Sequence, residues 1–117
     1  MHEYGIVQSM LKQLMPLVEA EADEYVRQIS VAVGPLSGIE PLQLQEAFEL
    51  LKPQFGLNDC ELDLQVSTLK ARCQACRRVV DLENFEFVCP LCGERELELL
   101  EGDRILVRSL TLSHREH

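Results

Sequence analysis

The sequence reads Cys73-Gln-Ala-Cys76, then twelve further residues, then Cys89-Pro-Leu-Cys92-Gly93, and the rest of the chain is organised around these residues. Two Cys-x-x-Cys pairs on tight turns can bring four sulfurs within reach of one ion. Tetrahedral thiolate coordination at about 2.3 Å is what zinc prefers in closed structural sites. Pro90 restricts one backbone angle, and Gly93 allows the positive φ that turns amide groups toward the sulfurs. We therefore predict a small zinc ribbon whose ligands are Cys73, Cys76, Cys89 and Cys92.

The same cysteines leave two alternatives. A rubredoxin-like iron site has the same four sulfur ligands, so the ligands alone do not choose between iron and zinc. Two disulfides would also use all four residues, but pairs separated by two residues rarely staple a fold. The start of the chain has no basic region ahead of an apolar run, and no stretch approaches the roughly 18 apolar residues of a membrane span. We therefore expect a reducing, cytoplasmic location and no membrane partner.

Composition bounds the class of protein. The chain has 117 residues, which favours one compact domain with a small module attached, and 46% of them are hydrophobic. The net charge of −9 argues against broad nucleic-acid binding, which needs a concentrated basic surface. Cys60, the fifth cysteine, stands alone in a strand-like segment, where we expect it to be a small buried apolar side chain.

The first part of the chain predicts a helix from residue 3 to about residue 22. An apolar stripe recurs at steps of three and four residues and comprises Ile6, Met10, Leu14, Leu17 and Val18. Pro16 interrupts this stripe. Because a proline in a helix interior removes a hydrogen bond and clashes with the previous turn, we expect a kink or a break near Met15.

The remaining segments predict a mixed sheet and a second helix. Residues 28–33 and 61–66 alternate in polarity like strands, the latter with Leu62, Leu64 and Val66 facing inward. Between them, Pro41 suits a first helical position, and Pro53 ends that helix at about Lys52. A strand, a helix and a strand in this order favour a right-handed crossover and parallel pairing. The buried face of the second helix should consist of Leu44, Ala47, Phe48 and Leu51.

The segment 104–112 returns to strand composition after the cysteines. A lone strand is not stable by itself, so it most simply rejoins the first sheet. We therefore predict an α+β fold, with a small mixed three-stranded sheet, two helices and an inserted zinc-ribbon-like module. The first domain would comprise residues 1–69 and 101–117, and the inserted module residues 70–100.

Two residues outside the cysteines are candidate ligands. His2 stands at the extreme amino terminus, where an exposed chain end would be its ordinary role. Its imidazole nitrogen nevertheless suits nickel, copper and zinc, and it could chelate together with its own backbone nitrogen. Glu40 precedes a helix start, a position where the helix dipole already favours a carboxylate. No catalytic constellation is visible, so we do not expect an enzyme.

Several motifs together resemble one family, the HypA/HybF nickel chaperones of [NiFe] hydrogenase maturation. The order of motifs is specific and spans essentially the whole chain. The motifs are Met1-His2-Glu3, the Val33-Gly34-x-Leu36-Ser37-Gly38 turn, Phe48-Glu49-Leu50-Leu51 and the two Cys-x-x-Cys pairs.

The resemblance implies a nickel chaperone with two metals. It implies that His2 is the essential Ni(II) ligand, with backbone nitrogens and the Glu3 region beside it, and that Glu40 is a further nickel ligand or neighbour. It implies a structural Zn(II) on the four cysteines, a partner GTPase, and delivery to the hydrogenase large subunit. The rival classes are a zinc ribbon that binds nucleic acid or protein, and a rubredoxin-like iron electron carrier.

Overall fold

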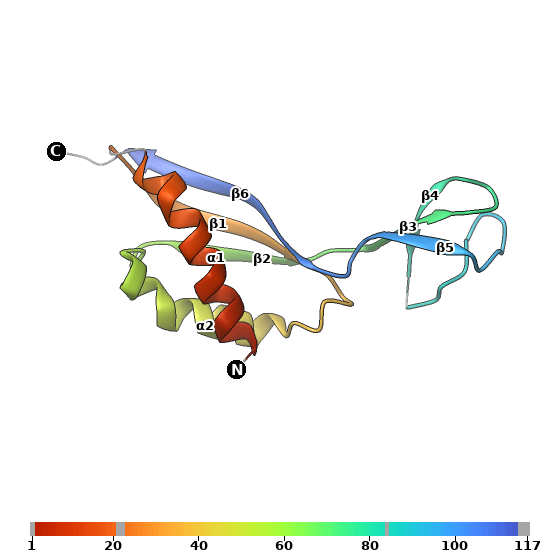
Figure 1. The fold of residues 1–117 in the computed structure, drawn as a ribbon, viewed down its shortest axis with the longest axis horizontal. Helices are drawn as coiled ribbons and strands as arrows, with labels where there is room; N and C mark the ends of the chain where they lie inside the picture. Colours follow the sequence, from red (N-terminus) through yellow and green to blue (C-terminus); the bar gives the residue numbers. More distant parts are fainter. Residues whose placement is uncertain (1, 21–22, 84, 115–117) are drawn as a thin grey trace.

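The computed structural model describes residues 2–20, 23–83 and 85–114 and has two lobes, each built on a three-stranded sheet (Figure 1). The molecule is elongated, with extents of 59 × 28 × 18 Å. No helix in these residues has the length and apolarity to cross a membrane. The elements are α1 (His2–Glu19), β1 (Glu24–Val33), α2 (Pro41–Leu51), the 3-10 helix η1 (Lys52–Phe55), β2 (Glu61–Val66), β3 (Leu69–Cys73), β4 (Val79–Leu82), β5 (Leu97–Glu101) and β6 (Ile105–His114).

The sheet of the first lobe has β1 at its centre, in the order β2-β1-β6. β1 pairs parallel with β2 and antiparallel with β6, so that Val31 lies opposite both Leu64 and Val107. The strand after the cysteines therefore does rejoin the first sheet. In Figure 1, α1 crosses in front of this sheet and α2 runs below β2. The predicted α+β fold with a mixed three-stranded sheet is confirmed.

Helix α2 forms where the sequence predicts it. Glu40 is the N-cap residue, and Pro41 follows at the first helical position, where its missing N–H costs nothing. The four residues predicted for its inner face are all buried, with Phe48 and Leu51 fully inaccessible. The α-helix ends at Leu51, and Pro53 lies in the 3-10 turn that follows. The two prolines and the spacing of the apolar residues were therefore sufficient to predict α2.

Helix α1 differs from the prediction in two respects. It continues through Pro16 to Glu19, so a break near Met15 is wrong. Pro16 removes one backbone hydrogen bond, but the buried Val18 holds the last turn against the core. Its inner face is also rotated, because α1 packs mainly on α2: Val7 and Leu11 are fully buried, whereas the predicted Leu17 is 65% exposed. Residues 21–22, the predicted helix end, lie outside the described residues.

The strands depart from simple alternation at their ends. β1 is longer than predicted, and its pairing with β6 shifts between Val26 and Gln28 and again between Ser30 and Val31. Such irregularities let residues that are not two apart share a face, which is how Val26 and Ile29 both reach the core. Val66, predicted to point inward, is 64% exposed because β2 leaves the lobe there.

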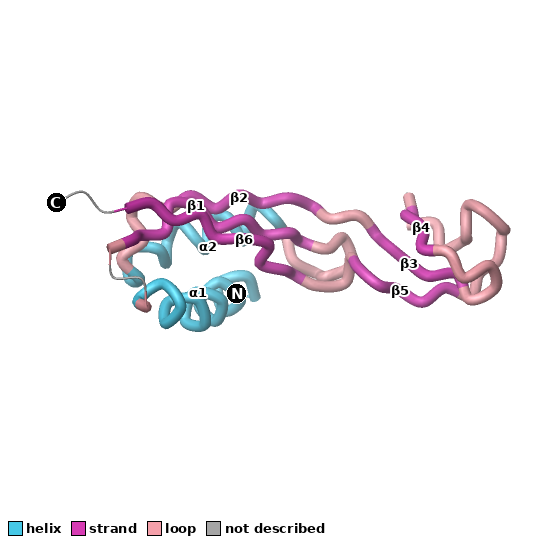
Figure 2. Tube along the Cα trace, turned by 90° about the horizontal axis from the view of Figure 1, so that it is seen from above, coloured by secondary structure: helices cyan, strands magenta, loops and turns pink. Residues whose placement is uncertain are grey.

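The second lobe is an antiparallel sheet in the order β4-β3-β5. Its core is small and comprises Leu69, Ala71, Cys73, Val80, Leu82 and Cys89. The first lobe has the larger core, which contains Cys60 at 1% exposure, as predicted. Figure 2 shows the chain passing between the lobes before β3 and again after β5. The division into residues 1–69 and 101–117 against 70–100 remains a prediction, and residues 1 and 115–117 lie outside the described part.

The neck between the lobes is packed backbone against backbone. The Gly34 amide donates to the Arg104 carbonyl at 2.9 Å, and the Leu36 amide donates to the Gly102 carbonyl at 2.8 Å. A Cβ at Gly34 would overlap the Gly102 carbonyl. Gly102 has a φ of 118°, and a Cβ added there would overlap the side chain of Leu69. The neck therefore requires glycine at both positions.

We expect Gly34→Ala to destabilise the protein by about 1–3 kcal/mol, since the added methyl must push backbone atoms apart. Gly5→Ala is the matched control, because Gly5 lies in α1 and a Cβ added to it would meet no atom within 4 Å. Alanine there should be neutral or stabilising by up to about 1 kcal/mol. Urea unfolding of the zinc-loaded proteins measures both changes, and a Gly34→Ala protein as stable as the wild type would contradict the close packing.

Candidate metal centres

Four cysteines of the second lobe meet at one point. Their sulfur atoms all lie within 4.8 Å of one another. The Sγ atoms of Cys73 and Cys92 are 3.5 Å apart, and those of Cys76 and Cys89 are 3.8 Å apart. A tetrahedron with metal–sulfur bonds of 2.3 Å has sulfur–sulfur edges of about 3.8 Å. The four side chains therefore have the spacing of a tetrahedral thiolate site, and all five cysteines of the chain are free thiols.

Both cysteine pairs have the same turn geometry. After the first pair, the Arg77 amide donates to the Cys73 carbonyl at 2.8 Å; after the second, the Gly93 amide donates to the Cys89 carbonyl at 2.9 Å. Arg77 and Gly93 both have positive φ, at 62° and 81°. The positive φ predicted for Gly93 is confirmed, and Arg77 adopts the same region despite its side chain. These matched turns point both sulfurs of each pair to one side.

The turns also set the acidity of the thiols. The Cys76 amide donates toward the Cys73 sulfur at 3.5 Å and lowers the pKa of Cys73 to about 7. Burial raises the pKa of Cys89, but hydrogen bonds from the Leu91 and Cys92 amides outweigh it and leave that pKa below its ordinary value. The Glu94 amide lowers the pKa of Cys92, yet the neighbouring thiols and burial together raise it to about 12.

These opposing effects on the thiol pKa values are what a metal-binding cluster would show. The amide donors favour thiolates, while crowding of the sulfurs disfavours a second and third negative charge without a cation. Thiolate, and not thiol, is the metal ligand, so binding would release the remaining protons. Cys60 lies in the other core, where burial raises its pKa to about 11. It is therefore an inert thiol outside this cluster.

The predicted residues of the amino terminus lie in the first lobe. His2 is exposed at the first residue of α1, whereas the adjacent Glu3 is buried, with 8% of its surface accessible. The Glu40 amide donates to Oε2 of Glu3 at 3.2 Å. The Glu40 carboxylate in turn accepts the Gln43 amide at 2.8 Å. The structure thus brings Glu3 and Glu40 together where the two helices begin.

Glu3 is held as a carboxylate. Hydrogen bonds from the Glu40 amide and from its own amide lower its pKa, against a smaller opposing effect of burial. The positive charges of His2 and of the chain amine also lower the pKa of Glu3. A negative charge at this place is also favoured by the positive ends of two helix dipoles. The start of α1 therefore combines an exposed imidazole with an ionised, buried carboxylate.

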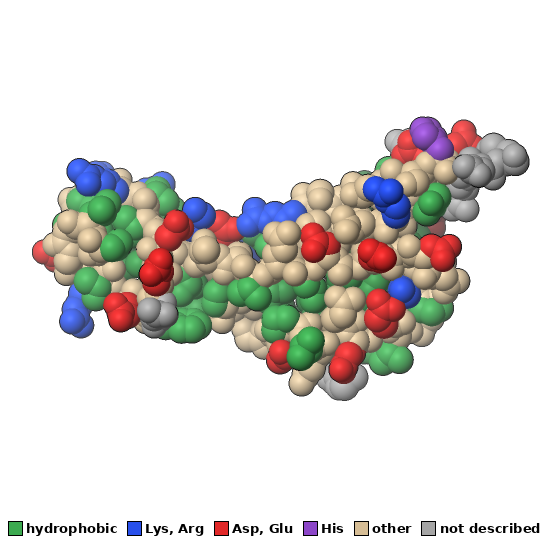
Figure 3. All heavy atoms as spheres, turned by 180° about the vertical axis from the view of Figure 1, so that it is seen from behind, with side chains coloured by type: hydrophobic (Ala, Val, Ile, Leu, Met, Phe, Trp, Pro, Cys, Tyr) green, Lys and Arg blue, Asp and Glu red, His purple; other side chains and the backbone are tan. Residues whose placement is uncertain are grey.

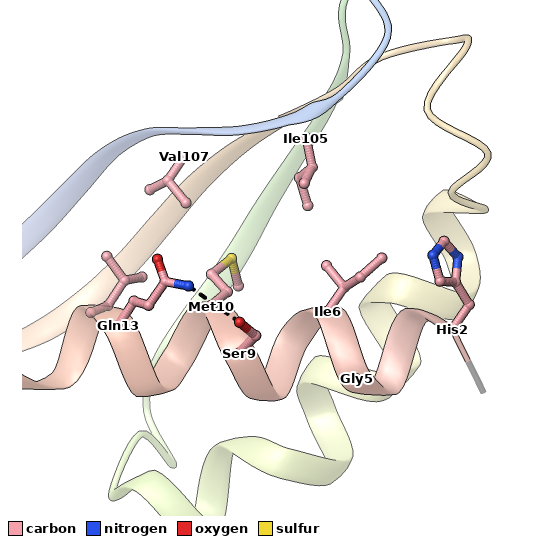
Figure 4. Close-up of a pocket in the computed structure, with 9 residues that line it drawn as sticks. His2, Gly5, Ile6, Ser9, Met10, Gln13, Ile105 and Val107 are labelled. Carbon is pink, nitrogen blue, oxygen red and sulfur yellow. Dashed lines mark hydrogen bonds between the residues drawn. The ribbon is translucent and has the colours of Figure 1, made fainter.

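A groove of about 630 Å³ runs from His2 between α1 and β6 (Figure 4). Ile105 and Val107 descend from β6 toward Ile6 and Met10 of α1, and His2 stands at one end. The sequence did not predict this groove, because it arises where α1 leans on α2 and away from the edge strand. The only hint was a glycine within a helix, at position 5, where packing does not require it. The full lining is His2, Gly5, Ile6, Ser9, Met10, Gln13, Leu14, Ile105 and Val107.

Comparison with known proteins shows the family of the chain. The family model described as "Hydrogenase/urease nickel incorporation, metallochaperone, hypA" matches residues 1–112. Hydrogenase maturation factor HypA of Aquifex aeolicus is 31% identical, over 96% of this chain and 97% of the relative. The protein of that name from Shewanella baltica is 30% identical, over 99% of each chain.

Solved structures agree in fold. The solution structure of the Ni metallochaperone HypA from Helicobacter pylori superposes with a TM-score of 0.71 at 19% identity, and covers 97% of this chain and 98% of its own. A second solution structure, of HypA protein, has a TM-score of 0.72 at 21% identity and covers 94% of each chain. The family description names a metallochaperone, which carries a metal and is not an enzyme. The resemblance inferred from the motifs is therefore confirmed, and the chain belongs to the HypA family of hydrogenase maturation metallochaperones.

Proposed function

We propose that this chain binds Ni(II) at its amino terminus and delivers it to the large subunit of [NiFe] hydrogenase during maturation. The observation that carries the proposal is the exposed His2 at the first residue of α1, beside the joined residues Glu3 and Glu40. The partners would be a maturation GTPase and the large-subunit precursor, in the cytoplasm. The metal is cargo, so its site must be open to solvent, as His2 is.

Backbone nitrogens at this end are available as ligands. The first four N–H groups of an α-helix have no acceptor within the helix. Since α1 begins at His2, coordination by the amides of His2 and Glu3 would break no hydrogen bond of the α-helical ladder. With the terminal amine and the His2 imidazole, these amides give four nitrogen donors, a set that favours square-planar Ni(II).

A helix amino terminus ordinarily repels a cation, because its dipole end is positive. Two deprotonated amides would remove this objection. They cancel the charge of Ni(II), so that a complex with a neutral amine and imidazole has no net charge. The carboxylates of Glu3 and Glu40 lie beside the same helix ends and offset the dipoles further. The nitrogen site is thus electrostatically compatible with its place in the fold.

For the cysteine centre we propose one structural Zn(II), held by Cys73, Cys76, Cys89 and Cys92. The sulfur spacing and the amide donors support a tetrahedral metal ion there. Zinc in such a site cross-links the two cysteine pairs. Because four thiolates fill its coordination sphere, no position is left for a substrate or a reactive water. A red iron-loaded protein would instead indicate the rubredoxin-like alternative.

The charge distribution supports a protein client and not a nucleic acid. On the face seen in Figure 3, basic side chains form separate groups among acidic and uncharged ones. In the second lobe, Lys70 pairs with Asp81 at 3.1 Å and Arg72 with Glu98 at 3.6 Å. These bases are therefore engaged by neighbouring acids. Phosphate-backbone binding instead requires a concentrated basic surface.

The nickel site should depend on the register of the amino terminus. Adding Gly-Ser before Met1 moves the free amine while leaving every side chain in place. If the amine is a ligand, we expect at least a tenfold weaker nickel affinity, equivalent to about 1.4 kcal/mol, and His2→Ala should lose more. Calorimetric titration at equal zinc content measures this.

His114→Ala is the matched control, since His114 is an exposed histidine at the end of β6, next to Glu24. It should leave nickel affinity unchanged. Equal affinities for the native, extended and His2→Ala proteins would rule out the amino-terminal site and with it the proposed cargo function.

The zinc module should unfold separately from the first lobe. In zinc-loaded protein at pH 7 we expect no rapid maleimide labelling. A chelator should expose the four cysteines of the centre, while Cys60 stays protected by burial and by its pKa of about 11 until denaturant is added. Mass spectrometry counts the labels.

Amide exchange is the second readout. β3 to β5 should lose protection on chelation, because structural zinc sites of this kind contribute on the order of 10–16 kcal/mol of binding energy to folding. β1 should keep its protection. Five labels after chelation alone, or loss of protection in β1, would contradict the proposed division into residues 1–69 with 101–117 and residues 70–100.

A further inference from the structure

We propose that the Glu3 carboxylate is a positioning residue that fixes His2 by completing the cap of α2, and that it does not ligate nickel. This inference rests on the proposed nickel site at His2. It concerns which part of Glu3 serves that site: its backbone nitrogen, and not its side chain. Glu40 is likewise assigned to the cap, by both its amide and its carboxylate.

The cap of α2 is a capping box completed from another helix. In the ordinary capping box the N-cap side chain accepts the N3 amide, and a Glu at N3 reaches back to the N-cap amide. Here Glu40 is the N-cap and accepts the N3 amide, that of Gln43, at 2.8 Å. The returning carboxylate is that of Glu3, which accepts the Glu40 amide at 3.2 Å from 37 residues away. The bond from the Glu40 amide to Glu3 therefore joins the two helix starts, and the bond from the Gln43 amide to Glu40 closes the box within α2.

Glu3 and the preceding residue, His2, differ in their exposure to solvent. Glu3 is the one polar or charged residue of the described chain in the buried class, at 8% accessibility, whereas His2 is exposed. Turning the Glu3 side chain toward a metal at the chain end would leave the Glu40 amide without its acceptor. An unpaired, partly buried donor is costly, so the carboxylate is better kept where it is.

The anchor lies one residue from the imidazole. With Glu3 tied to α2, the first turn of α1 has a fixed rotation, and His2 projects at the open end of the groove (Figure 4). The amides of His2 and Glu3 are then held together at the exposed helix end. A chelate that uses consecutive backbone nitrogens gains from such prior ordering, because less conformational freedom is lost on binding.

The positioning role depends on the length of the side chain and not on its charge. Glu3→Gln keeps an amide oxygen at the same distance and loses the charge. Glu3→Asp keeps the carboxylate but is shorter by one C–C bond of about 1.5 Å, so it falls short of the Glu40 amide. A metal-ligand role predicts the opposite order, since an ionised oxygen is the better ligand for a divalent ion.

The experiment compares Glu3→Gln, Glu3→Asp and Glu3→Ala by nickel calorimetry, by the visible absorption of bound Ni(II), and by amide exchange of Glu40 without nickel. We expect Glu3→Gln to keep the native spectrum and an affinity within about threefold. Glu3→Asp and Glu3→Ala should both lose at least about tenfold and should speed exchange of the Glu40 amide. Glu46→Asp and Glu46→Ala, at an exposed position of α2, are the control variants and should change none of these readouts.

Several outcomes would overturn the proposal. Glu3→Asp binding nickel better than Glu3→Gln, or a spectrum changed in Glu3→Gln, would make the carboxylate a ligand. Equal Glu40 exchange in all proteins would show that Glu3 does not complete the cap. Exchange of the core Phe48 amide checks that each variant is folded. If nickel binding survives His2→Ala while the Glu3 variants alter Glu40 exchange as expected, the cap stands and the proposed nickel function is what fails.

Discussion

The hydrogen bond from the Glu40 amide to the Glu3 carboxylate is the contact on which the geometry of the proposed nickel site depends. It joins the first turn of α1 to the first turn of α2, and the apolar faces of both helices then meet over β1 and β2. Because α1 is held at its start and leans on α2, it stays away from β6 and leaves the groove beside His2. The buried Glu3 carboxylate thus ties the helix starts together beside the exposed His2.

The second lobe depends on a different constraint, the convergence of four sulfurs. Its core contains only six buried residues, two of them cysteines of the centre, so apolar burial alone is too small to hold three short strands. In the proposed zinc-loaded protein, metal coordination supplies the remainder. The first lobe has fifteen buried core residues and needs no such support. Glycines at 34 and 102 then connect two lobes with unequal sources of stability.

The sequence predicted those features that follow from short-range chemistry. Paired cysteines, Pro41 at a helix start and the apolar period of α2 each specify their structure locally, and all were confirmed. The failures were tertiary. Leu17 and Val66 fit their patterns but lie beyond the reach of the packed layers. The burial of Glu3 was equally invisible, because its partner is an amide 37 residues away, and no periodicity of one segment reports such a contact.

The cysteine centre and the proposed nickel site differ in how tightly they would hold a metal, as expected for a structural metal and a metal that is delivered. Four thiolates on matched turns would enclose the proposed zinc ion, and its loss would remove the support of a small core. At the proposed nickel site, the donors are nitrogens at an exposed helix end whose N–H groups lie outside the i to i−4 hydrogen bonds of the helix. Returning protons to these amides on release would therefore leave the α-helical hydrogen bonds unchanged and would restore the bond from the Glu3 amide to its own carboxylate. A site of this kind can give up its metal without unfolding, provided that Glu3 keeps the helix start in place.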